Sequence, residues 1–398
     1  MADVVLVAAR DEEERIGATV AALREQFPEA EILVADDGSQ DATAARAEAA
    51  GARVVRLPRR GKGQALTAAE REARPGRLLL ADADLAGDLR PLAAADADLA
   101  IAVFAARRGG GFGIAKHTAR GLIRTLSGID AREPLSGQRA LSPAARRAVF
   151  PLAAGFGCEV RSTIDAARAG LRIEEVELPL GHRATGRNLG GFAHRARQLV
   201  DALLGAGPTA VNHRGLRLPV VGWLAGLGRD VWPVALIGLA DDVWSGPERG
   251  FREHLGSGRT TGMLKLVGIP AVGLVRTRSL SGTLLVALSS NALNQLDTKP
   301  GRALKAYLVA ASAVGAPRRL AVCLLPYDLR EMGMLGDAGA NALGALLGLN
   351  SVSRLTARGR WIAVGALAGL TLLGERRSLG AIVERTPLLR ELDALGRV

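Results

Sequence analysis

The chain has few cysteines and few aromatic residues. Cys158 and Cys323 are its two cysteines, and they lie far apart in unrelated contexts. This argues against a disulfide framework and a cysteine-ligated zinc site, and it fits a reducing compartment. Aromatic residues make up 3% of the 398 residues, and no basic run is interleaved with side chains on which bases could stack. We therefore expect no nucleic-acid partner.

Targeting and membrane signals are also scarce. No secretory signal opens the chain, because Met1-Ala2-Asp3 leads directly into the apolar run VVLVAA. We therefore expect the N-terminal part in the cytosol. Among the later apolar segments, only 279–296 reaches 18 uncharged residues, whereas a membrane-spanning helix needs roughly 20 apolar residues. The pattern therefore does not fix a number of spans.

The positive charge of the chain is unevenly distributed. The net charge is +12; residues 1–210 hold 29 Lys and Arg against 27 Asp and Glu, and residues 211–398 hold 23 against 13. The second half is therefore both basic and apolar. Anionic lipid headgroups or phosphate-bearing substrates suit such a region better than nucleic acid does.

Residues before about 205 alternate between short β-rich runs and helical stretches. VVLVAA, EILVADD and ARVVRL each precede a stretch of helical period. Such alternation is typical of a parallel α/β sheet with helices on both faces, which binds ligands at the carboxyl ends of its strands. Asp36-Asp37 and Asp82-Ala83-Asp84 both end apolar runs. The sequence therefore predicts that these acidic pairs meet in one crevice.

Residues after the segment Gly205-Ala206-Gly207-Pro208 form a different region. Short apolar segments rich in Gly, Ala and Leu are separated there by Arg, Lys and Asp. This composition fits a helical bundle with buried Ala and Leu faces, and it also fits a membrane domain. Small-residue runs such as GANALGALLG suit close helix packing in lipid.

The first half contains the motifs VAARDEEERIG, DDGSQDAT and LLLADADL. These motifs resemble those of family 2 glycosyltransferases of the GT-A fold, and the resemblance covers residues 1 to about 200 in order. It implies that Asp37 contacts the nucleotide, that Lys62 lies beside the diphosphate, and that Asp82 and Asp84 bind a metal. Glu12 stands in the first motif and is expected on the donor side. That motif lacks the family's proline and asparagine, so it does not specify the nucleotide base.

The chemistry of sugar transfer explains these residue types. A nucleotide-diphosphate sugar leaves behind a diphosphate, whose growing negative charge must be neutralised. Mg²⁺ or Mn²⁺ held by carboxylates can do this, and a lysine adds a point charge. Hard divalent cations prefer oxygen ligands, which favours Asp over His or Cys. Taken alone, Gly61-Lys62-Gly63 fits an ordinary exposed turn equally well.

Two further segments, LSGQRA at 135–140 and GFGCEV at 155–160, resemble the acceptor side of the family's polyprenyl-phosphate and related members. The resemblance places Gln138 at the acceptor and Glu159 at the acidic position. Glu159, with Asp84, is the candidate catalytic residue. It would act as a general base toward a hydroxyl acceptor, whereas an anionic phosphate acceptor needs no base. The alternative for Glu159 is a carboxylate at a helix start, favoured by the helix dipole.

A basic segment follows at 178–199. Arg183 and Arg187 are expected to grip a phosphorylated acceptor through charge-assisted hydrogen bonds. These arginines fit anionic lipid headgroups equally well. His182 is a candidate third metal ligand, although a lone histidine more often has a structural role.

Three acidic motifs lie in the second half, at 239–242, 290–297 and 334–341. They resemble, in order, those of the polyprenyl-phosphate N-acetylhexosamine-1-phosphate transferase superfamily. These integral membrane enzymes use Mg²⁺ to move a phosphosugar from a uridine nucleotide onto a polyprenyl phosphate. The resemblance runs from about Val211 to the C-terminus, and it implies membrane-spanning helices around a cytosolic-face metal and phosphate site. The residues of that site would be Asp241, Asp242, Lys265, Asn291, Asn294, Asp297 and Asp337.

The second half departs from that superfamily in two motifs. Thr298 follows Asp297 where the superfamily has a glycine, and no histidine follows His254, whereas the superfamily carries a histidine-rich loop near its end. The apolar segments are also fewer and shorter than the superfamily's ten spans. We therefore expect this half to bind a polyprenyl carrier and to anchor the first domain.

These features together predict a two-domain membrane glycosyltransferase. A GT-A α/β domain with a Rossmann-like, mostly parallel sheet occupies 1–205, a linker 206–212, and an all-α transmembrane domain 213–398. The predicted reaction moves a sugar, with inversion, from a nucleotide-diphosphate donor to a polyprenyl-phosphate-linked or membrane-proximal acceptor in cell-envelope glycan synthesis. The predicted location is the cell membrane, with the first domain on the cytoplasmic face. A bifunctional enzyme, whose second half also transfers a phosphosugar, and a non-enzymatic membrane scaffold are the alternatives.

Overall fold

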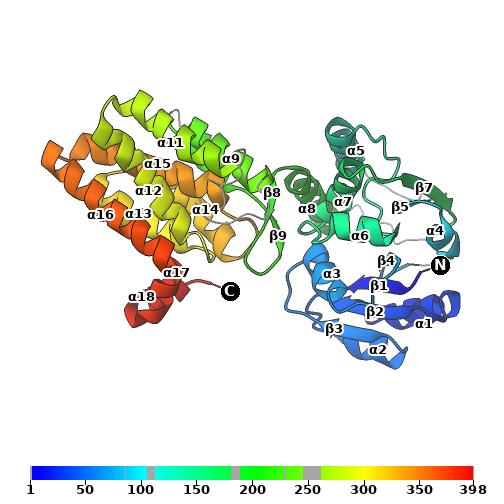
Figure 1. Cartoon of the computed structure of the whole chain (residues 1–398). Helices are drawn as coiled ribbons and strands as arrows, with labels where there is room; N and C mark the ends of the chain where they lie inside the picture. Colours follow the sequence, from blue (N-terminus) through cyan, green and yellow to red (C-terminus); the bar gives the residue numbers. More distant parts are fainter. Residues whose placement is uncertain are drawn as a thin grey trace. The chain divides into compact units, whose positions relative to one another are not determined.

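The computed structural model describes residues 2–85, 87–104, 113–180, 189–227, 230–244 and 261–397. The chain divides into two compact units, which can be followed by colour in Figure 1. The first unit contains Met1–Gly207 and Gly215–Arg217, and the second contains Pro208–Arg214 and Leu218–Val398.

A seven-stranded sheet forms the centre of the first unit (Figure 1). The strand order is β3-β2-β1-β4-β6-β5-β7; β6 runs antiparallel to β4 and β5, and the other pairs are parallel. The strands are β1 (Val4–Ala9), β2 (Glu31–Asp36), β3 (Arg53–Arg56), β4 (Leu78–Asp82), β5 (Leu99–Phe104), β6 (Arg139–Leu141) and β7 (Ile173–Leu178). The predicted α/β fold with a mostly parallel sheet is therefore confirmed for this unit.

Helices cover both faces of this sheet. Val5 of β1 joins Ile16 of α1 in one apolar core, whereas Val4 joins Leu66 of α3 in the other. Because both faces are buried at the centre of the sheet, β1 and β5 are continuous apolar runs rather than alternating ones. The helices are α1 (Ile16–Gln26), α2 (Thr43–Ala49), α3 (Lys62–Glu70), α4 (Arg90–Ala94), α5 (Ile114–Ser127), α6 (Pro143–Val149), α7 (Gly157–Arg168) and α8 (Leu189–Ala206).

The carboxyl ends of β1, β2 and β4 lie next to one another. Ala8 of β1 is in register with Asp82 of β4, and Ala9 is in register with Asp36 of β2. The two acidic pairs predicted from the sequence therefore follow strands that end at the same edge, where open α/β sheets bind their ligands.

The second unit is helical, and α15 packs closely on α12. A Cβ at Gly344 would lie 2.4 Å from Ser290 Cα, and one at Gly348 would lie 2.6 Å from Val286 Cα. Gly344 and Gly348 therefore allow the close contact between these two helices. The elements are β8 (Thr209–Val211), β9 (Arg217–Pro219), the 3₁₀ helix η1 (Gly222–Leu227), α9 (Trp232–Trp244), α11 (Thr261–Thr277), α12 (Leu280–Leu296), α13 (Arg302–Val314), α14 (Arg319–Leu329), α15 (Gly336–Arg354), α16 (Ala357–Arg376), α17 (Leu379–Arg385) and α18 (Pro387–Ala394).

The predicted transmembrane character of this unit is wrong. None of the helices in the described ranges combines the length with the apolar composition that a bilayer crossing requires. α12 is 17 residues long, or about 26 Å at 1.5 Å per residue, which is short of the roughly 30 Å apolar core of a bilayer. α16 has 20 residues, but Arg358 and Arg360 lie in its first turn and Glu375 and Arg376 in its last.

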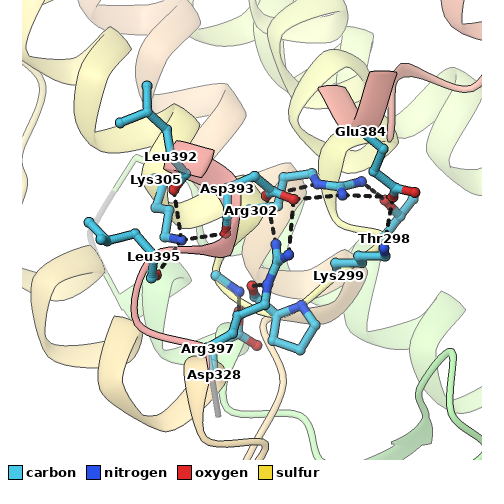
Figure 2. A network of polar contacts seen from close by, with 12 residues as sticks. Thr298, Lys299, Arg302, Lys305, Asp328, Glu384, Leu392, Asp393, Leu395 and Arg397 are labelled. Atoms are coloured by element: carbon cyan, nitrogen blue, oxygen red, sulfur yellow. Dashed lines mark hydrogen bonds and ion pairs between the residues drawn. The ribbon is translucent and has the colours of Figure 1, made fainter. Parts of the chain in front are cut away.

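A polar network holds the last helices against the start of α13 (Figure 2). Arg302 is 4% exposed and donates hydrogen bonds of 3.0 and 2.8 Å to the two carboxylate oxygens of Asp393. Lys305 donates to the backbone carbonyl of Asp393 at 2.6 Å. Burial raises the pKa of Asp393, but hydrogen bonds from Arg302 and Arg397 outweigh burial and lower it to about 2. Arg397 also donates to the backbone carbonyl of Pro300 at 2.7 Å. The C-terminal residues therefore contact the loop that follows α12, where Asp297 lies.

Candidate active site

The first polar cluster lies where β2 ends. Asp37 is buried, and its carboxylate accepts the backbone N–H of Arg60 at 2.7 Å and that of Gly61 at 2.9 Å. Gly61 has a φ of +102°, which residues with a side chain rarely adopt. It directly precedes α3, which begins at Lys62. Asp37, predicted to contact the nucleotide, thus fixes the turn that carries Lys62.

Lys62 joins two carboxylates from distant parts of the sequence. Its ammonium nitrogen lies 2.6 Å from Asp82 Oδ1 and 2.8 Å from Glu159 Oε1. Burial lowers the pKa of Lys62, but the charges of Asp82 and Glu159 outweigh burial, and the net pKa is well above its usual value. Lys62 therefore remains a positive charge at physiological pH, as a diphosphate-binding role requires.

Asp82 has partners on both carboxylate oxygens. Lys62 contacts Oδ1, and the side-chain amide of Gln138 donates to Oδ2 at 2.9 Å. Gln138, expected at the acceptor, thus contacts the metal-motif aspartate here. Gly137 packs directly against this pair, because a Cβ there would lie 2.5 Å from Asp82 Oδ2 and 2.6 Å from Lys62 Nζ. The sequence does not single out Gly137, and its position beside Gln138 is the one signal that points to it.

Glu159 lies in the first turn of α7 and is 3% exposed. Its Oε1 accepts from Lys62, and the thiol of Cys158 donates to its Oε2 at 3.0 Å. Burial, followed by the charge of Glu159, raises the pKa of Cys158 well above its usual value, so the thiol keeps its proton. Both carboxylate oxygens therefore have partners inside the domain. This arrangement suits a Glu159 that holds the Lys62 ammonium in place better than a Glu159 that removes a proton from an acceptor.

Arg15 is a cation on the donor side that sequence reasoning does not identify. It donates to Glu12 Oε2 at 2.8 Å. This hydrogen bond and the charge of Glu12 raise the pKa of Arg15, and the charges of Glu14 and Asp84 add to the effect. Asp84 therefore lies within electrostatic reach of Arg15. The backbone N–H of Glu12 donates to Thr43 Oγ1 at 2.7 Å, which fixes the chain after β1.

Asp82 and Asp84 fit a divalent cation that is also bound by a diphosphate. Both side chains are partly exposed at the end of β4, and Mg²⁺ is usually held by one or two carboxylates together with substrate phosphates. In the described part of the chain, no three His, Cys, Asp or Glu side chains are grouped so that they could hold a metal by themselves. His182, Arg183 and Arg187 lie outside the described residues, so their predicted roles stay predictions.

Arg139 of β6 is a second buried cation beneath this site. It is 2% exposed and donates to the hydroxyls of Ser162 at 3.0 Å and Thr163 at 2.9 Å. These hydroxyls in turn donate to the backbone carbonyl of Glu159. Burial lowers the pKa of Arg139, and the charge of Glu159 opposes this effect. An arginine on a three-residue strand has no sequence pattern that would reveal such burial.

The second unit contains a separate cluster of carboxylates around Lys265. The ammonium of Lys265 lies 2.6 Å from Asp241 Oδ2 and also contacts Asp337. Asp242 accepts the backbone N–H groups of Asp337 and Ala338 at 2.9 Å each, at the start of α15. Burial, reinforced by Asp337, raises the pKa of Asp242 to about 7, and burial raises that of Asp337 to about 6. The predicted residues Asp241, Asp242, Lys265 and Asp337 thus lie together.

The other predicted residues of the second unit have different surroundings. Asp297 ends α12, and burial followed by the charge of Asp328 raises its pKa well above the usual range. Asp328, which the sequence does not single out, accepts two backbone N–H groups. Asn294 offers its backbone carbonyl to the N–H of Asp297 at 3.0 Å. Asn291 instead donates to the Thr371 hydroxyl at 3.2 Å, on α16.

Comparison with known families supports the first unit alone. The glycosyl transferase family 2 model matches residues 4–134, which include Asp37, Lys62, Asp82 and Asp84. No curated protein matches the chain. The resemblance of the second half to phosphosugar transferases lies outside the matched range and stays a prediction.

Several solved structures similar to this chain are of glucosyl-3-phosphoglycerate synthase from Mycobacterium tuberculosis. The complex with Mn²⁺, uridine diphosphate and glucosyl-3-phosphoglycerate is 28% identical, with a TM-score of 0.42 over 51% of this chain and 78% of that chain. The complex with Mg²⁺ and uridine diphosphate is 26% identical, with a TM-score of 0.43 over 51% and 78%. The complex with Mn²⁺, uridine-diphosphate-glucose and phosphoglyceric acid is 26% identical, with a TM-score of 0.43 over 54% and 84%.

The family match lies within the unit that has the α/β sheet, and the acidic pairs end two of its parallel strands. The first unit therefore contains a family 2 glycosyltransferase domain of the GT-A fold.

Proposed function

We propose that the first unit transfers a sugar from a nucleotide-diphosphate donor to an acceptor, with inversion at the sugar carbon. The observation that carries the proposal is the pairing of Lys62 with Asp82, at 2.6 Å, at the strand ends of a family 2 glycosyltransferase domain. A cation and a carboxylate are both present there, as a diphosphate leaving group and its metal ion require.

The residues of the site divide the work of stabilising the departing diphosphate. A divalent cation bound by Asp82 and Asp84 would supply a Lewis acid for the diphosphate oxygens. Lys62 supplies a second positive charge, and Asp37 holds the turn from which Lys62 extends. Gln138 orients the Asp82 carboxylate. Asp37 and Gln138 hold the turn and the Asp82 carboxylate before substrate binds, so little backbone reorganisation is needed during the reaction.

The acceptor that we propose is polyprenyl-phosphate-linked or otherwise close to the cytoplasmic face of the cell membrane. Two features of the second unit support this choice. Large apolar side chains are exposed there, including Val275, Val309 and Ile362 at 73 to 76%, and exposed apolar surface often marks a lipid or protein contact. Basic residues also outnumber acidic ones after residue 210, which favours phosphate-bearing partners.

The test measures nucleotide release from uridine- and guanosine-nucleotide sugars by the full-length protein with Mn²⁺. Undecaprenyl phosphate in detergent and 3-phosphoglycerate serve as a lipid and a water-soluble acceptor. We expect acceptor-dependent release of the nucleoside diphosphate, reduced at least about 100-fold in Asp82→Asn. Glu72→Gln, an exposed change in the same unit, should leave release unchanged. The proposal fails if no donor and acceptor pair releases a nucleoside diphosphate, or if Asp82→Asn retains full activity.

A second candidate function is phosphosugar transfer by the second unit. The cluster of Asp241, Asp242 and Asp337 around Lys265 favours it, because carboxylates and an ammonium group again lie together. Transfer of a phosphosugar from a uridine nucleotide releases UMP rather than UDP. UMP that depends on undecaprenyl phosphate and disappears in Asp242→Asn would establish this activity. If neither UDP nor UMP is released, the non-enzymatic membrane scaffold is the alternative that remains.

A further inference from the structure

Lys62 occupies the place on Asp82 that a divalent cation would need. The ammonium lies 2.6 Å from Asp82 Oδ1, and Gln138 donates to Oδ2 at 2.9 Å. Mg²⁺ binds carboxylate oxygens at about 2.0–2.1 Å, and a second positive charge cannot share the same oxygen without strong repulsion. The ammonium and the divalent cation therefore compete for Asp82.

Glu159 gives the ammonium of Lys62 a second anion. Glu159 Oε1 lies 2.8 Å from Lys62 Nζ, so the ammonium can remain paired when it leaves Asp82. Glu159 itself is fixed: it is 3% exposed, Cys158 donates to its other oxygen, and it belongs to the first turn of α7. The backbone at Lys62 is fixed as well, because Asp37 binds the turn before it. Movement is thus confined to the Lys62 side chain.

We propose that Lys62 is an internal counterion of Asp82 that a divalent cation displaces, and that Glu159 is the positioning residue that retains the displaced ammonium. This inference rests on the proposed glycosyl transfer. Before the donor binds, Lys62 neutralises Asp82. When cation and donor arrive together, the cation would take the place of the ammonium on Asp82, and Lys62 would become available to the diphosphate while Glu159 keeps it in the site. Glu159 therefore acts through Lys62 and not as an acceptor base.

The test is a Mn²⁺ titration of the full-length protein, with free Mn²⁺ counted from its electron paramagnetic resonance signal. Without nucleotide, Lys62→Met should bind Mn²⁺ about tenfold more tightly than the wild type, because a charge-assisted hydrogen bond no longer competes. Removal of any nearby positive charge strengthens cation binding to some degree. Arg59→Met is therefore the matched control, since Arg59 is an exposed residue of the same segment. A gain in Lys62→Met no larger than that in Arg59→Met would overturn the proposal.

A double-mutant cycle tests the role of Glu159. Glu159→Gln should weaken Mn²⁺ binding in the wild-type background, because Lys62 then has Asp82 as its remaining anion. The same change in a Lys62→Met background should have no effect, since Glu159 acts through the ammonium. Equal effects in both backgrounds would contradict a positioning role. Circular dichroism checks folding, and Lys62→Gln replaces Lys62→Met if the latter is unfolded.

The titration also separates this inference from the proposed function. If the wild type binds no Mn²⁺ even with uridine or guanosine diphosphate present, the glycosyltransferase proposal loses its metal site. Suppose instead that the wild type binds Mn²⁺ with nucleotide, but the Mn²⁺ affinity of Lys62→Met rises no more than that of Arg59→Met. The exchange of Lys62 for the cation on Asp82 is then refuted, and the glycosyltransferase proposal is not.

Discussion

Gly137→Ala adds one carbon at the most crowded point of the candidate site. The new Cβ would lie 2.5 Å from Asp82 Oδ2, 2.6 Å from Lys62 Nζ and 2.8 Å from Asp82 Oδ1, whereas ordinary contacts begin near 3.4 Å. Asp82 and Lys62 must therefore move by about 0.6–0.9 Å, the difference between these distances. The φ of Gly137 is outside the left-handed region, so alanine fits the backbone and the effect comes from space alone.

This displacement should reduce activity more than stability. The crowded atoms are the ends of two side chains, which can shift at low cost, so the loss of folding free energy should lie near the lower end of the roughly 1–3 kcal/mol of overpacking. A misplacement of about 1 Å in a catalytic group costs about 100-fold in rate, which corresponds to about 2.7 kcal/mol. The assay compares kcat/KM for nucleotide release with the urea midpoint of unfolding. Gly121→Ala is the control, because Gly121 lies in α5 with nothing within 4 Å of an added Cβ. That change should leave kcat/KM unchanged and raise stability by about 0.5–1 kcal/mol. A Gly137→Ala enzyme within about twofold of wild-type kcat/KM would refute the reasoning.

Three further changes probe other parts of the structure. Asp37→Asn removes the charge of the carboxylate that accepts two backbone N–H groups at 2.7 and 2.9 Å. The kcat/KM for nucleotide release should fall about tenfold. An unchanged kcat/KM would show that the position of Lys62 does not depend on Asp37. The pKa of Asp242 in the folded protein is about 7, above its value in the unfolded chain. The folded state therefore binds a proton that the unfolded state has already lost at these pH values. The free energy of unfolding should accordingly fall as pH rises from 5 to 8. Thermal unfolding of Asp242→Asn should depend less on pH over that range, and an identical pH dependence would count against this assignment. Asp393→Asn leaves the buried Arg302 without its main carboxylate, and it should lower the free energy of unfolding in urea by about 3 kcal/mol. The exposed change Glu72→Gln should lower it by less than about 1 kcal/mol. Equal losses would show that burial of the Arg302–Asp393 pair is unimportant for stability.

The sequence predicts the first unit well because its pattern is local. Apolar runs followed by acidic pairs mark strand ends, and parallel strands bring those ends to one edge, as the register of Ala8 with Asp82 shows. β6 is harder to predict, since it has three residues and runs antiparallel between β4 and β5. Gly137 and Arg139 depend on this strand and on α7, so their surroundings arise from tertiary packing that no local pattern encodes.

The prediction of membrane spans failed for a related reason. Gly, Ala and Leu allow close helix contact in lipid and in a helical bundle alike. In this chain, Gly344 and Gly348 serve the contact of α15 with α12, and no helix within the residues that the structure describes has both the length and the apolar character needed to span a bilayer. The acidic motifs of the second half did predict neighbours, because Asp241 and Asp337 meet at Lys265. Their chemical role stays a prediction.

The most direct test of the central claim is the identity of the nucleotide that the full-length protein releases. With Mn²⁺, a panel of uridine- and guanosine-nucleotide sugars and the two acceptors, we expect acceptor-dependent release of a nucleoside diphosphate from the wild type. Asp82→Asn should release at least about 100-fold less. A nucleoside monophosphate as the sole product, or equal release of the diphosphate by both proteins, would contradict glycosyl transfer at the Asp82 site.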